Sequence, residues 1–248
     1  MDRLFVLQNP DGEIDRMVIK EILHEERTRL CDGVITVPDD CMPKDVQEYL
    51  LRGIPGLHTP QSKIIPVGSI EFTERFLGHP MHPIEIPEIL LHMVKREYRR
   101  VKGKDIPSTD ASKYFFKDVT NLKRWNSLLY DGDISRFIDE GTEYVMAEKV
   151  NFTSEYRVFV CRGDVQAVMH YLGDPMKFPD PDYIQQCINL YEQIPHPLSY
   201  TMDIGIHDGQ TDIIEIHAFV SCGLYGFQDD CIPDMLEDGY AWYQRQTI

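Results

Sequence analysis

The sequence has few basic residues and no long apolar run, and these shortages exclude two classes of protein. It contains 25 Lys and Arg against 41 Asp and Glu, so its net charge is −16. A surface of this charge repels nucleic acid and anionic membranes. No stretch approaches the roughly 18 consecutive apolar residues of a membrane helix, and the first residues lack a basic segment followed by an apolar one. We therefore expect a soluble, cytoplasmic protein with neither nucleic-acid nor membrane partners.

Cysteine pairs and nucleophile motifs are missing as well. The six cysteines form no C-x-x-C pair and are too sparse for a disulfide-stapled secreted scaffold, which indicates reduced thiols. His170, His207 and His217 show no zinc-binding spacing. The G-x-S-x-G elbow of serine hydrolases is absent. The sequence therefore gives no support to a zinc hydrolase or to a serine nucleophile.

The first part of the chain alternates strand and helix patterns. The segments RLFVLQ (3–8) and GVITVP (33–38) predict short strands, and a helical pattern at 15–30 lies between them. A third apolar run ends at Gly68-Ser69, where Ser69 is the expected N-cap of a helix. The free N–H groups of this turn could hold an anion, although an ordinary capped helix explains the same pattern.

The segment PEILLHMVKREYRR (87–100) carries the strongest helix pattern in the chain. Proline stands in its first turn and basic residues stand in its last, as the helix dipole favours. We predict a helix there, with Arg96, Arg99 and Arg100 at its solvated end.

Strand patterns dominate from residue 113 onward. Successive predicted strands are KYFFKDV, EYVMAEKVNF, SEYRVFVCRG and DVQAVMHYLG. Helical patterns lie at 126–139 and 182–194, and a third closes the chain at 233–246. With 248 residues of which 42% are hydrophobic, the chain can form one large domain or two to three small lobes.

Two carboxylates lie in the predicted hairpin MDIGIHDGQTDIIEIH (202–217). If the loop has three residues, 208–210, Asp203 lies directly opposite Glu215, and Ile213, Glu215 and His217 share a face. If the turn is the two-residue Asp208-Gly209, Asp203 faces Ile214 and the two acids point to opposite faces. Opposed acids repel unless a cation lies between them, and Mg²⁺ suits such oxygen ligands. The alternative is that both acids simply face water on a half-exposed hairpin.

Three further strands carry charged residues that have both a plain and a functional interpretation. Lys117 shares a strand face with Phe115 and could reach a phosphate or stay solvated. Glu155 and Arg157 share a face and form either an internal ion pair or an anion-binding arginine. The pair Glu148-Lys149 ends an apolar strand.

In order along the chain, these pieces resemble the ATP-grasp superfamily, in particular the compact bacterial and phage proteins related to ribosomal-protein-modifying and peptide ligases. The resemblance rests on PVGSIEFTERFL, YFFKD, SEYRVFV, MDIGI and IIEIHAFVSCGLYG, and covers roughly residues 64–227. It implies an α+β fold: an α/β N-terminal lobe followed by two antiparallel-sheet lobes that grip a nucleotide in a cleft. The implied domains are residues 1–85, 86–150 and 151–248.

The resemblance also implies a role for each of these residues. Lys117 resembles the lysine that contacts the ATP phosphates, and Arg157 resembles the arginine that neutralises the γ-phosphate or an acyl phosphate. The cofactor-binding residues are completed by the hinge Glu148, Lys149 and Val150, with Glu155. The implied metal ligands are Asp203, Glu215 and His217.

Two features depart from the family pattern. His217 stands where asparagine is usual, and imidazole suits Mg²⁺ less well than an amide oxygen. The stretch DVTNLKRWNS (118–127) lacks the glycines of a flexible phosphate-covering loop. Lys123 or Arg124 could donate to phosphates instead, or could be surface charges.

The implied reaction is an ATP- and Mg²⁺-dependent carboxylate–amine ligation through an acyl phosphate, with release of ADP and phosphate. Its substrates would be small-molecule or peptide carboxylates and amines. Two alternatives stay open: a phosphotransferase on the same fold and a non-catalytic ATP-binding or interaction protein. The identity of the substrates and the oligomeric state are not predicted.

Overall fold

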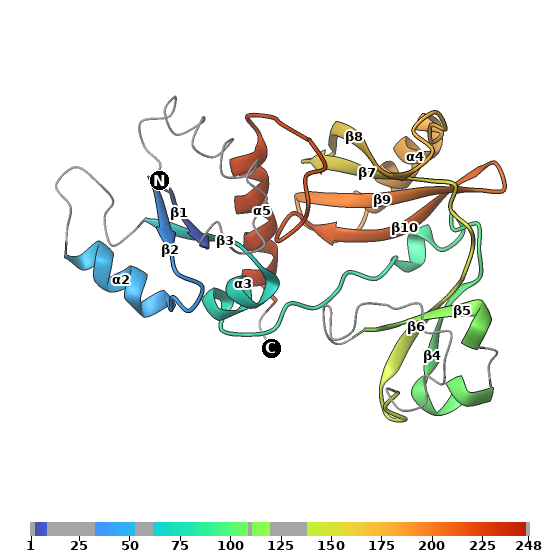
Figure 1. Cartoon of the computed structure of the whole chain (residues 1–248), viewed down its shortest axis with the longest axis horizontal. Helices are drawn as coiled ribbons and strands as arrows, with labels where there is room; N and C mark the ends of the chain where they lie inside the picture. Colours follow the sequence, from blue (N-terminus) through green and yellow to red (C-terminus); the bar gives the residue numbers. More distant parts are fainter. Residues whose placement is uncertain (1–2, 9–32, 53–61, 109–110, 120–137, 247–248) are drawn as a thin grey trace.

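The computed structural model describes residues 3–8, 33–52, 62–108, 111–119 and 138–246, which form three β-sheets with helices packed on them (Figure 1). The first, the parallel sheet, has the strand order β2-β1-β3. Its strands and helices are β1 (Arg3–Gln8), β2 (Gly33–Val37), α2 (Pro43–Leu51), β3 (Lys63–Val67) and α3 (Ile70–Leu77). This is the predicted α/β arrangement.

Helix α3 begins as the sequence predicts. The Ser69 hydroxyl accepts a hydrogen bond from the Phe72 N–H at 3.2 Å, which confirms Ser69 as the N-cap. The Ser69 N–H donates to Gln8 Oε1 at 2.6 Å. Two N–H groups of this turn therefore already have partners within the protein.

The second sheet, the small sheet, is antiparallel with the order β4-β6-β5. Its strands are β4 (Tyr98–Lys102), β5 (Tyr114–Asp118) and β6 (Glu143–Glu148). Short 3-10 helices accompany it: η1 (Glu88–Leu90), η2 (Gly103–Ser108) and η3 (Ala111–Lys113). Strands β5 and β6 confirm the predictions, whereas β4 begins inside the segment predicted to be a helix.

The third sheet, the large sheet, is antiparallel with the order β10-β9-β7-β8. Its strands and helices are β7 (Ser154–Cys161), β8 (Asp164–Gly173), α4 (Pro181–Tyr191), β9 (Ser199–His207), β10 (Gln210–Ala218) and α5 (Ile232–Gln244). All of them lie where the sequence predicts strands and helices.

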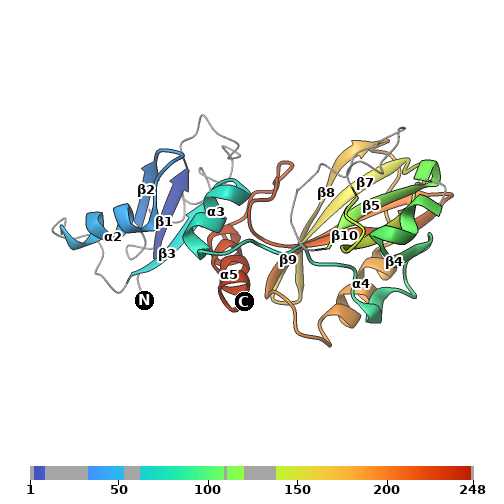
Figure 2. The ribbon, with the colours of Figure 1, turned by 90° about the horizontal axis from the view of Figure 1, so that it is seen from below.

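The two faces of the large sheet pack against different partners. On one face, Val158 packs into a core with Ile188 of α4. On the other face, Phe159 shares a core with α5 and with Phe5 of the parallel sheet. Figure 2 shows α5 between these two sheets. Because side chains alternate along β7, Arg157 lies on the face of Phe159, away from the α4 core.

The helix predicted over residues 87–100 is wrong. The structure has only the 3-10 helix η1, an irregular segment and then β4, which pairs along its length with β6. Leu90 and Met93 are buried in the α4 core, and the Met93 carbonyl accepts a hydrogen bond from the Tyr183 hydroxyl at 2.7 Å. These tertiary contacts outweigh helix propensity, which is worth less than about 1 kcal/mol for an ordinary residue.

Some predictions fall outside the described residues: the helix at 15–30, nearly all of the helix at 126–139, and Lys123 and Arg124. Within the described ranges, no helix is both long enough and apolar enough to cross a membrane. The α+β fold class is confirmed, because a parallel-sheet α/β part is joined to two antiparallel sheets.

Candidate functional site

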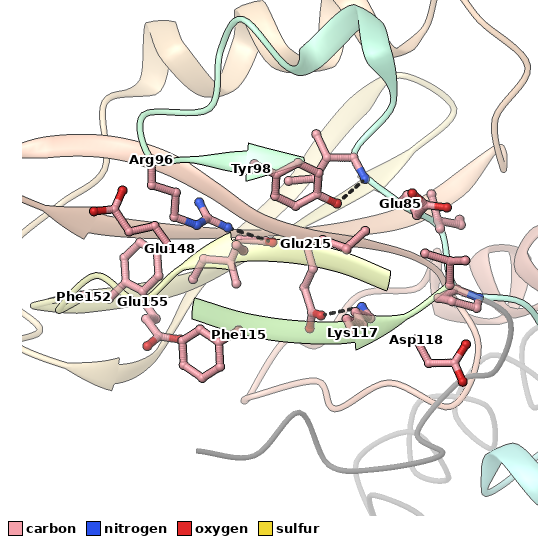
Figure 3. A pocket seen from close by; sticks show the side chains of 17 residues that line it. Glu85, Arg96, Tyr98, Phe115, Lys117, Asp118, Glu148, Phe152, Glu155 and Glu215 are labelled. Atoms are coloured by element: carbon pink, nitrogen blue, oxygen red, sulfur yellow. Dashed lines mark hydrogen bonds and ion pairs between the residues drawn. The ribbon is translucent and has the colours of Figure 1, made fainter. Parts of the chain in front are cut away.

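A cavity of about 250 Å³ lies between the small sheet and the large sheet (Figure 3). Strands β5 and β6 form one wall, β10 and the start of β7 form the opposite wall, and the segment before β4 closes a third side. Its charged and aromatic lining residues are Glu85, Arg96, Tyr98, Phe115, Lys117, Asp118, Glu148, Phe152, Glu155 and Glu215. Four predicted site residues, Lys117, Glu148, Glu155 and Glu215, therefore face one cavity.

The turn of the β9–β10 hairpin differs from the one that the predicted site requires. His207 pairs directly with Gln210, so Asp208-Gly209 is a two-residue turn, with φ of 49° and 74°. Positive φ at both central residues is the pattern of a type I′ turn, which favours Asp-Gly. The predicted three-residue loop is wrong, and a regular ladder from this turn would turn Asp203 and Glu215 to opposite faces.

A β-bulge restores the expected pairing. Strand β10 carries one extra residue, Ile214, between Ile213 and Glu215, and beyond it Glu215 pairs with Asp203. The bulge leaves Ile213 in the α4 core, whereas Glu215 lines the cavity beside His217. The predicted placement of Ile213 on the face of Glu215 is wrong, but the predicted opposition of the two acids is confirmed.

Asp203 is held by Arg157 in a buried bidentate ion pair. Arg157 donates from Nε to Oδ1 and from Nη2 to Oδ2, both at 2.8 Å, and the two side chains are 9% and 3% exposed. Arg157 Nη1 donates to the Gly223 carbonyl at 3.1 Å, and the Tyr225 ring centroid lies 5.0 Å from the guanidinium carbon. Burial alone would lower the pKa of Arg157, but Asp203 outweighs burial and holds this pKa above its usual range. Arg157 is therefore a fixed cation.

Glu215 makes more exposed contacts. Lys117 Nζ donates to Oε2 at 3.1 Å from the opposite wall, as Figure 3 shows, and His217 Nε2 lies 2.8 Å from Oε1. Lys117 and Glu215 are each 34% exposed. Burial alone would raise the pKa of Glu215, but His217 and Lys117 outweigh burial and hold this pKa well below its usual range. Glu215 is thus a carboxylate whose partners are open to exchange with solvent or a ligand.

Glu155 is a third carboxylate beside the cavity. Its Oε2 accepts a hydrogen bond from the Tyr171 hydroxyl at 2.8 Å. Burial raises the pKa of Glu155, the Tyr171 hydrogen bond opposes this shift, and the nearby Asp203 and Glu215 add to it. Tyr171 also stacks on Tyr225 with ring centroids 4.8 Å apart, so one aromatic pair borders both Glu155 and the arginine pair.

The predicted hinge has fewer free backbone donors than the prediction assumes. The Glu148 N–H donates to the Glu97 carbonyl and the Lys149 N–H donates to the Lys113 carbonyl, both at 2.8 Å. The Glu148 side chain accepts from the Glu97 N–H at 3.1 Å. Val150 is half-buried and is not among the described residues that line the cavity. A base bound here would therefore be contacted by other atoms of residues 148–150.

The acids fit a metal ion that arrives with a nucleotide better than a resident ion. Within the ranges the structure describes, no group of three His, Cys, Asp or Glu side chains is arranged to hold a metal. Mg²⁺ needs only one or two protein carboxylates when phosphates supply other oxygens. Asp203 and Glu215 oppose each other and meet that requirement. His217 is the weakest of the three predicted ligands because magnesium prefers oxygen.

The sequence did not predict a second buried ion pair beside the cavity. Arg96 Nη1 lies 2.5 Å from Asp212 Oδ2, and the two side chains are 4% and 0% exposed. Arg96 is therefore not at a solvated helix end, whereas Arg99 and Arg100 are more than half exposed. One signal could have revealed Asp212: an acid inside an otherwise apolar strand needs a buried partner. Arg96 itself was hidden in a basic run.

Comparisons with known proteins agree with this architecture. Residues 93–235 match the model of an ATP-grasp domain family, the second family of its clade. No curated protein sequence matches the chain significantly. Among solved structures, the chain is similar to the D-alanine–D-alanine ligase from Bacillus anthracis, with a TM-score of 0.54, 12% identity and 99% of each chain covered.

Two further solved structures are similar over nearly the whole chain. D-cycloserine synthetase DcsG has a TM-score of 0.52 and 10% identity, with 97% of this chain and 99% of that chain covered. The ATP-grasp ligase PsnB, complexed with a minimal precursor, has a TM-score of 0.51 and 14% identity, with 98% and 100% covered. At these identities the likeness shows the fold alone. Because the family match spans more than half of the 248 residues, the chain belongs to this family of ATP-grasp domains.

Proposed function

We propose that this protein is an ATP- and Mg²⁺-dependent carboxylate–amine ligase. The γ-phosphoryl group of ATP passes to an oxygen of a substrate carboxylate, which breaks its bond to ADP and forms an acyl phosphate. An amine then attacks the acyl carbon and loses a proton, an amide bond forms and phosphate leaves. Such catalysis depends on positioning and charge neutralisation, and needs no covalent enzyme nucleophile.

One observation carries the proposal: Lys117 and Glu215 meet across the cavity from two different sheets. A flexible ammonium suits phosphate oxygens, and a carboxylate suits a divalent cation. Entry of a nucleotide with its metal would separate the pair, because each side chain gains a new partner of opposite charge. Their contact in the ligand-free chain keeps both charges neutralised at the site where they would act.

Arg157 and Asp203 form the rigid part of the proposed site. Arg157 has five N–H donors, and those not directed at Asp203 or Gly223 can donate to a phosphoryl group. Mg²⁺, when bound with ATP, would neutralise charge on the phosphates and would be held by Asp203 and Glu215. Glu155 and residues 148–150 would border the remainder of the nucleotide.

A second candidate, a nucleotide-binding protein without turnover, is favoured by His217. Its imidazole lies against Glu215 at the position where an amide oxygen would serve a second metal ion better. A phosphotransferase differs from both, because its phosphorylated product is stable without an amine.

Thermal unfolding with ATP tests the nucleotide site first. ATP should raise the unfolding temperature of the wild type, and Mg²⁺ should increase that shift, because a ligand of the folded state stabilises it by mass action. Glu215→Gln should abolish the magnesium-dependent part. Glu143→Gln, which alters an exposed acid of the small sheet, is the matched control and should behave as wild type. No shift in the wild type would sink the proposal.

ADP release then separates the candidates. A ligase should release ADP only when both a carboxylate and an amine are supplied, whereas a phosphotransferase should accumulate phosphorylated product without the amine. Binding without ADP release in any such screen would favour the protein without turnover. The substrates are proposed as small-molecule or peptide carboxylates and amines, and the cytoplasmic location and the domain boundaries 1–85, 86–150 and 151–248 stay predictions.

A further inference from the structure

The bulge at Ile214 decides where Glu215 points. Ile213 and Ile216 both lie in the α4 core although they are three residues apart, and Ile214 and Glu215 both line the cavity although they are adjacent. Regular alternation along a strand permits neither arrangement. Without the bulge, the two-residue turn would place Ile214 opposite Asp203 and move Glu215 to the other face.

A bulge leaves backbone groups without ladder partners, and here Arg96 supplies them. Arg96 Nη1 donates to the Ile213 carbonyl at 2.6 Å, and Arg96 Nη2 donates to the Ile214 carbonyl at 3.4 Å. Arg96 thus joins the carbonyls of the extra residue and of the residue before it. Such a buried carbonyl costs about 1–3 kcal/mol when it has no partner, so the bulge depends on this donor.

Neighbouring groups hold Arg96 in place from the other side. Asp212 accepts from Arg96 through Oδ2 and from the Lys95 N–H through Oδ1 at 2.9 Å. His207 Nε2 lies 3.3 Å from the same Oδ2. The Phe152 ring centroid lies 5.5 Å from the guanidinium carbon. The planar fork of Arg96 is therefore clamped between a carboxylate, two carbonyls and an aromatic ring.

We propose that Arg96 is a positioning residue for Glu215, acting through the carbonyls of the bulge. Arg96 lies two residues before the small sheet begins, and Glu215 belongs to the large sheet. The contact therefore ties the entry of one wall of the cavity to the register of the other wall. With a side chain only 4% exposed and its donors directed at Asp212 and the bulge, Arg96 acts on the site indirectly.

The register of the hairpin tests this role without any ligand. Nuclear Overhauser effects between strands report which residue lies opposite Asp203. In wild type this residue should be Glu215. In Arg96→Lys it should become Ile214, because a lysine ammonium keeps the charge but lacks the planar fork that reaches both carbonyls. An unchanged register in Arg96→Lys would overturn the proposal, and Arg99→Lys on the exposed part of β4 is the matched control.

A deletion provides a rescue that general destabilisation cannot mimic. Removing Ile214 leaves a regular ladder from the two-residue turn, in which Glu215 follows Ile213 and lies opposite Asp203 without a bulge. The double variant with Arg96→Lys should therefore regain the Asp203–Glu215 contact. A double variant that remains out of register would contradict the role assigned to Arg96. If Arg96→Lys does not fold, Asp212→Asn takes its place, since it keeps an acceptor for the Lys95 N–H but weakens the anchor of Arg96.

The metal response gives a second readout, which rests on the proposed function. With ADP as the probe, we expect the Mg²⁺ concentration for half-maximal thermal stabilisation to rise about 10–100-fold in Arg96→Lys, the usual loss when a residue that orients a ligand is changed. ADP without Mg²⁺ should stabilise both proteins equally. An unchanged Mg²⁺ midpoint in a variant whose register has slipped would overturn the link from Arg96 to the metal site. A slipped register with no Mg²⁺ response in wild type would retain the role of Arg96 and reject the proposed function.

Discussion

Asp203 and Glu215 lie opposite each other on neighbouring strands, yet their surroundings differ sharply. Asp203 is bound at both oxygens by Arg157 in a pair that is almost fully buried. Glu215 is bound by Lys117 and approached by His217, and its pair is about one-third exposed. One acid is thus part of the interior, and the other lies on the cavity wall.

This difference separates rigidity from exchange within one site. A buried charge pair costs much to break, because the remaining charge cannot be solvated. An exposed pair is worth little and rearranges readily. The arrangement lets Asp203 and Arg157 keep their geometry while Lys117 and Glu215 change partners when a ligand enters.

The largest effect is expected from breaking the buried pair. Asp203→Ala should lower the free energy of unfolding by about 3–5 kcal/mol, because Arg157 is left buried without its carboxylate. Urea denaturation measures this loss through the transition midpoint. A double variant with Arg157→Leu should recover part of the stability, because the unpaired charge is removed. A loss below about 1 kcal/mol for Asp203→Ala would contradict the comparison.

Breaking the exposed pair should affect binding more than stability. Lys117→Met should change the free energy of unfolding by about 1 kcal/mol or less and weaken ATP binding about tenfold, because a phosphate-contacting cation is lost. Calorimetric titration with ATP and urea denaturation give the two numbers. Lys102→Met on the exposed side of β4 is the control and should leave both unchanged. A large stability loss with intact ATP binding would reverse the roles assigned to the two pairs.

Acid titration should show opposite signs at the two half-buried glutamates. Glu215 has a lowered pKa, so its stabilising effect is present above the unfolded value of about 4.3 and is lost as the pH falls. Wild type should therefore lose stability relative to Glu215→Gln below about pH 4.5, by about 1 kcal/mol or less after solvent screening.

Glu155 has a raised pKa, chiefly from burial, so its charged form destabilises the fold and protonation removes that penalty. Wild type should gain stability relative to Glu155→Gln as the pH falls from neutrality toward about pH 4. Chemical denaturation across this range measures both differences. Slopes of the same sign for the two variants would contradict the environments described for them.

The smallest effect is expected from the aromatic cover of the buried pair. Tyr225→Leu removes the ring over Arg157 and its stack on Tyr171, and should cost about 0.5–1.5 kcal/mol of unfolding free energy. Tyr225→Phe retains both ring contacts and should lie close to wild type. Equal losses in the two variants would show that the hydroxyl matters and not the ring.

Local patterns predicted much of this architecture. The alternation in β7 to β10, the N-cap at Ser69 and the final helix follow from residues close together in sequence. The segment 87–100 failed because its helix propensity is weaker than the burial of Leu90 and Met93 and the pairing of β4 with β6. The hairpin prediction reached the correct pairing of Asp203 and Glu215 from a wrong loop, since a bulge offset the missing residue in the turn.

The sequence by itself determined the strands, the caps and the presence of two acids on one hairpin, because each depends on periodicity or turn chemistry within a few residues. Only the tertiary structure decided which way Glu215 points and what it contacts. Arg96 and Ile213 are 117 residues apart, and Lys117 and Glu215 are 98 apart. Contacts over such distances form when separate sheets pack together, and no local pattern encodes them.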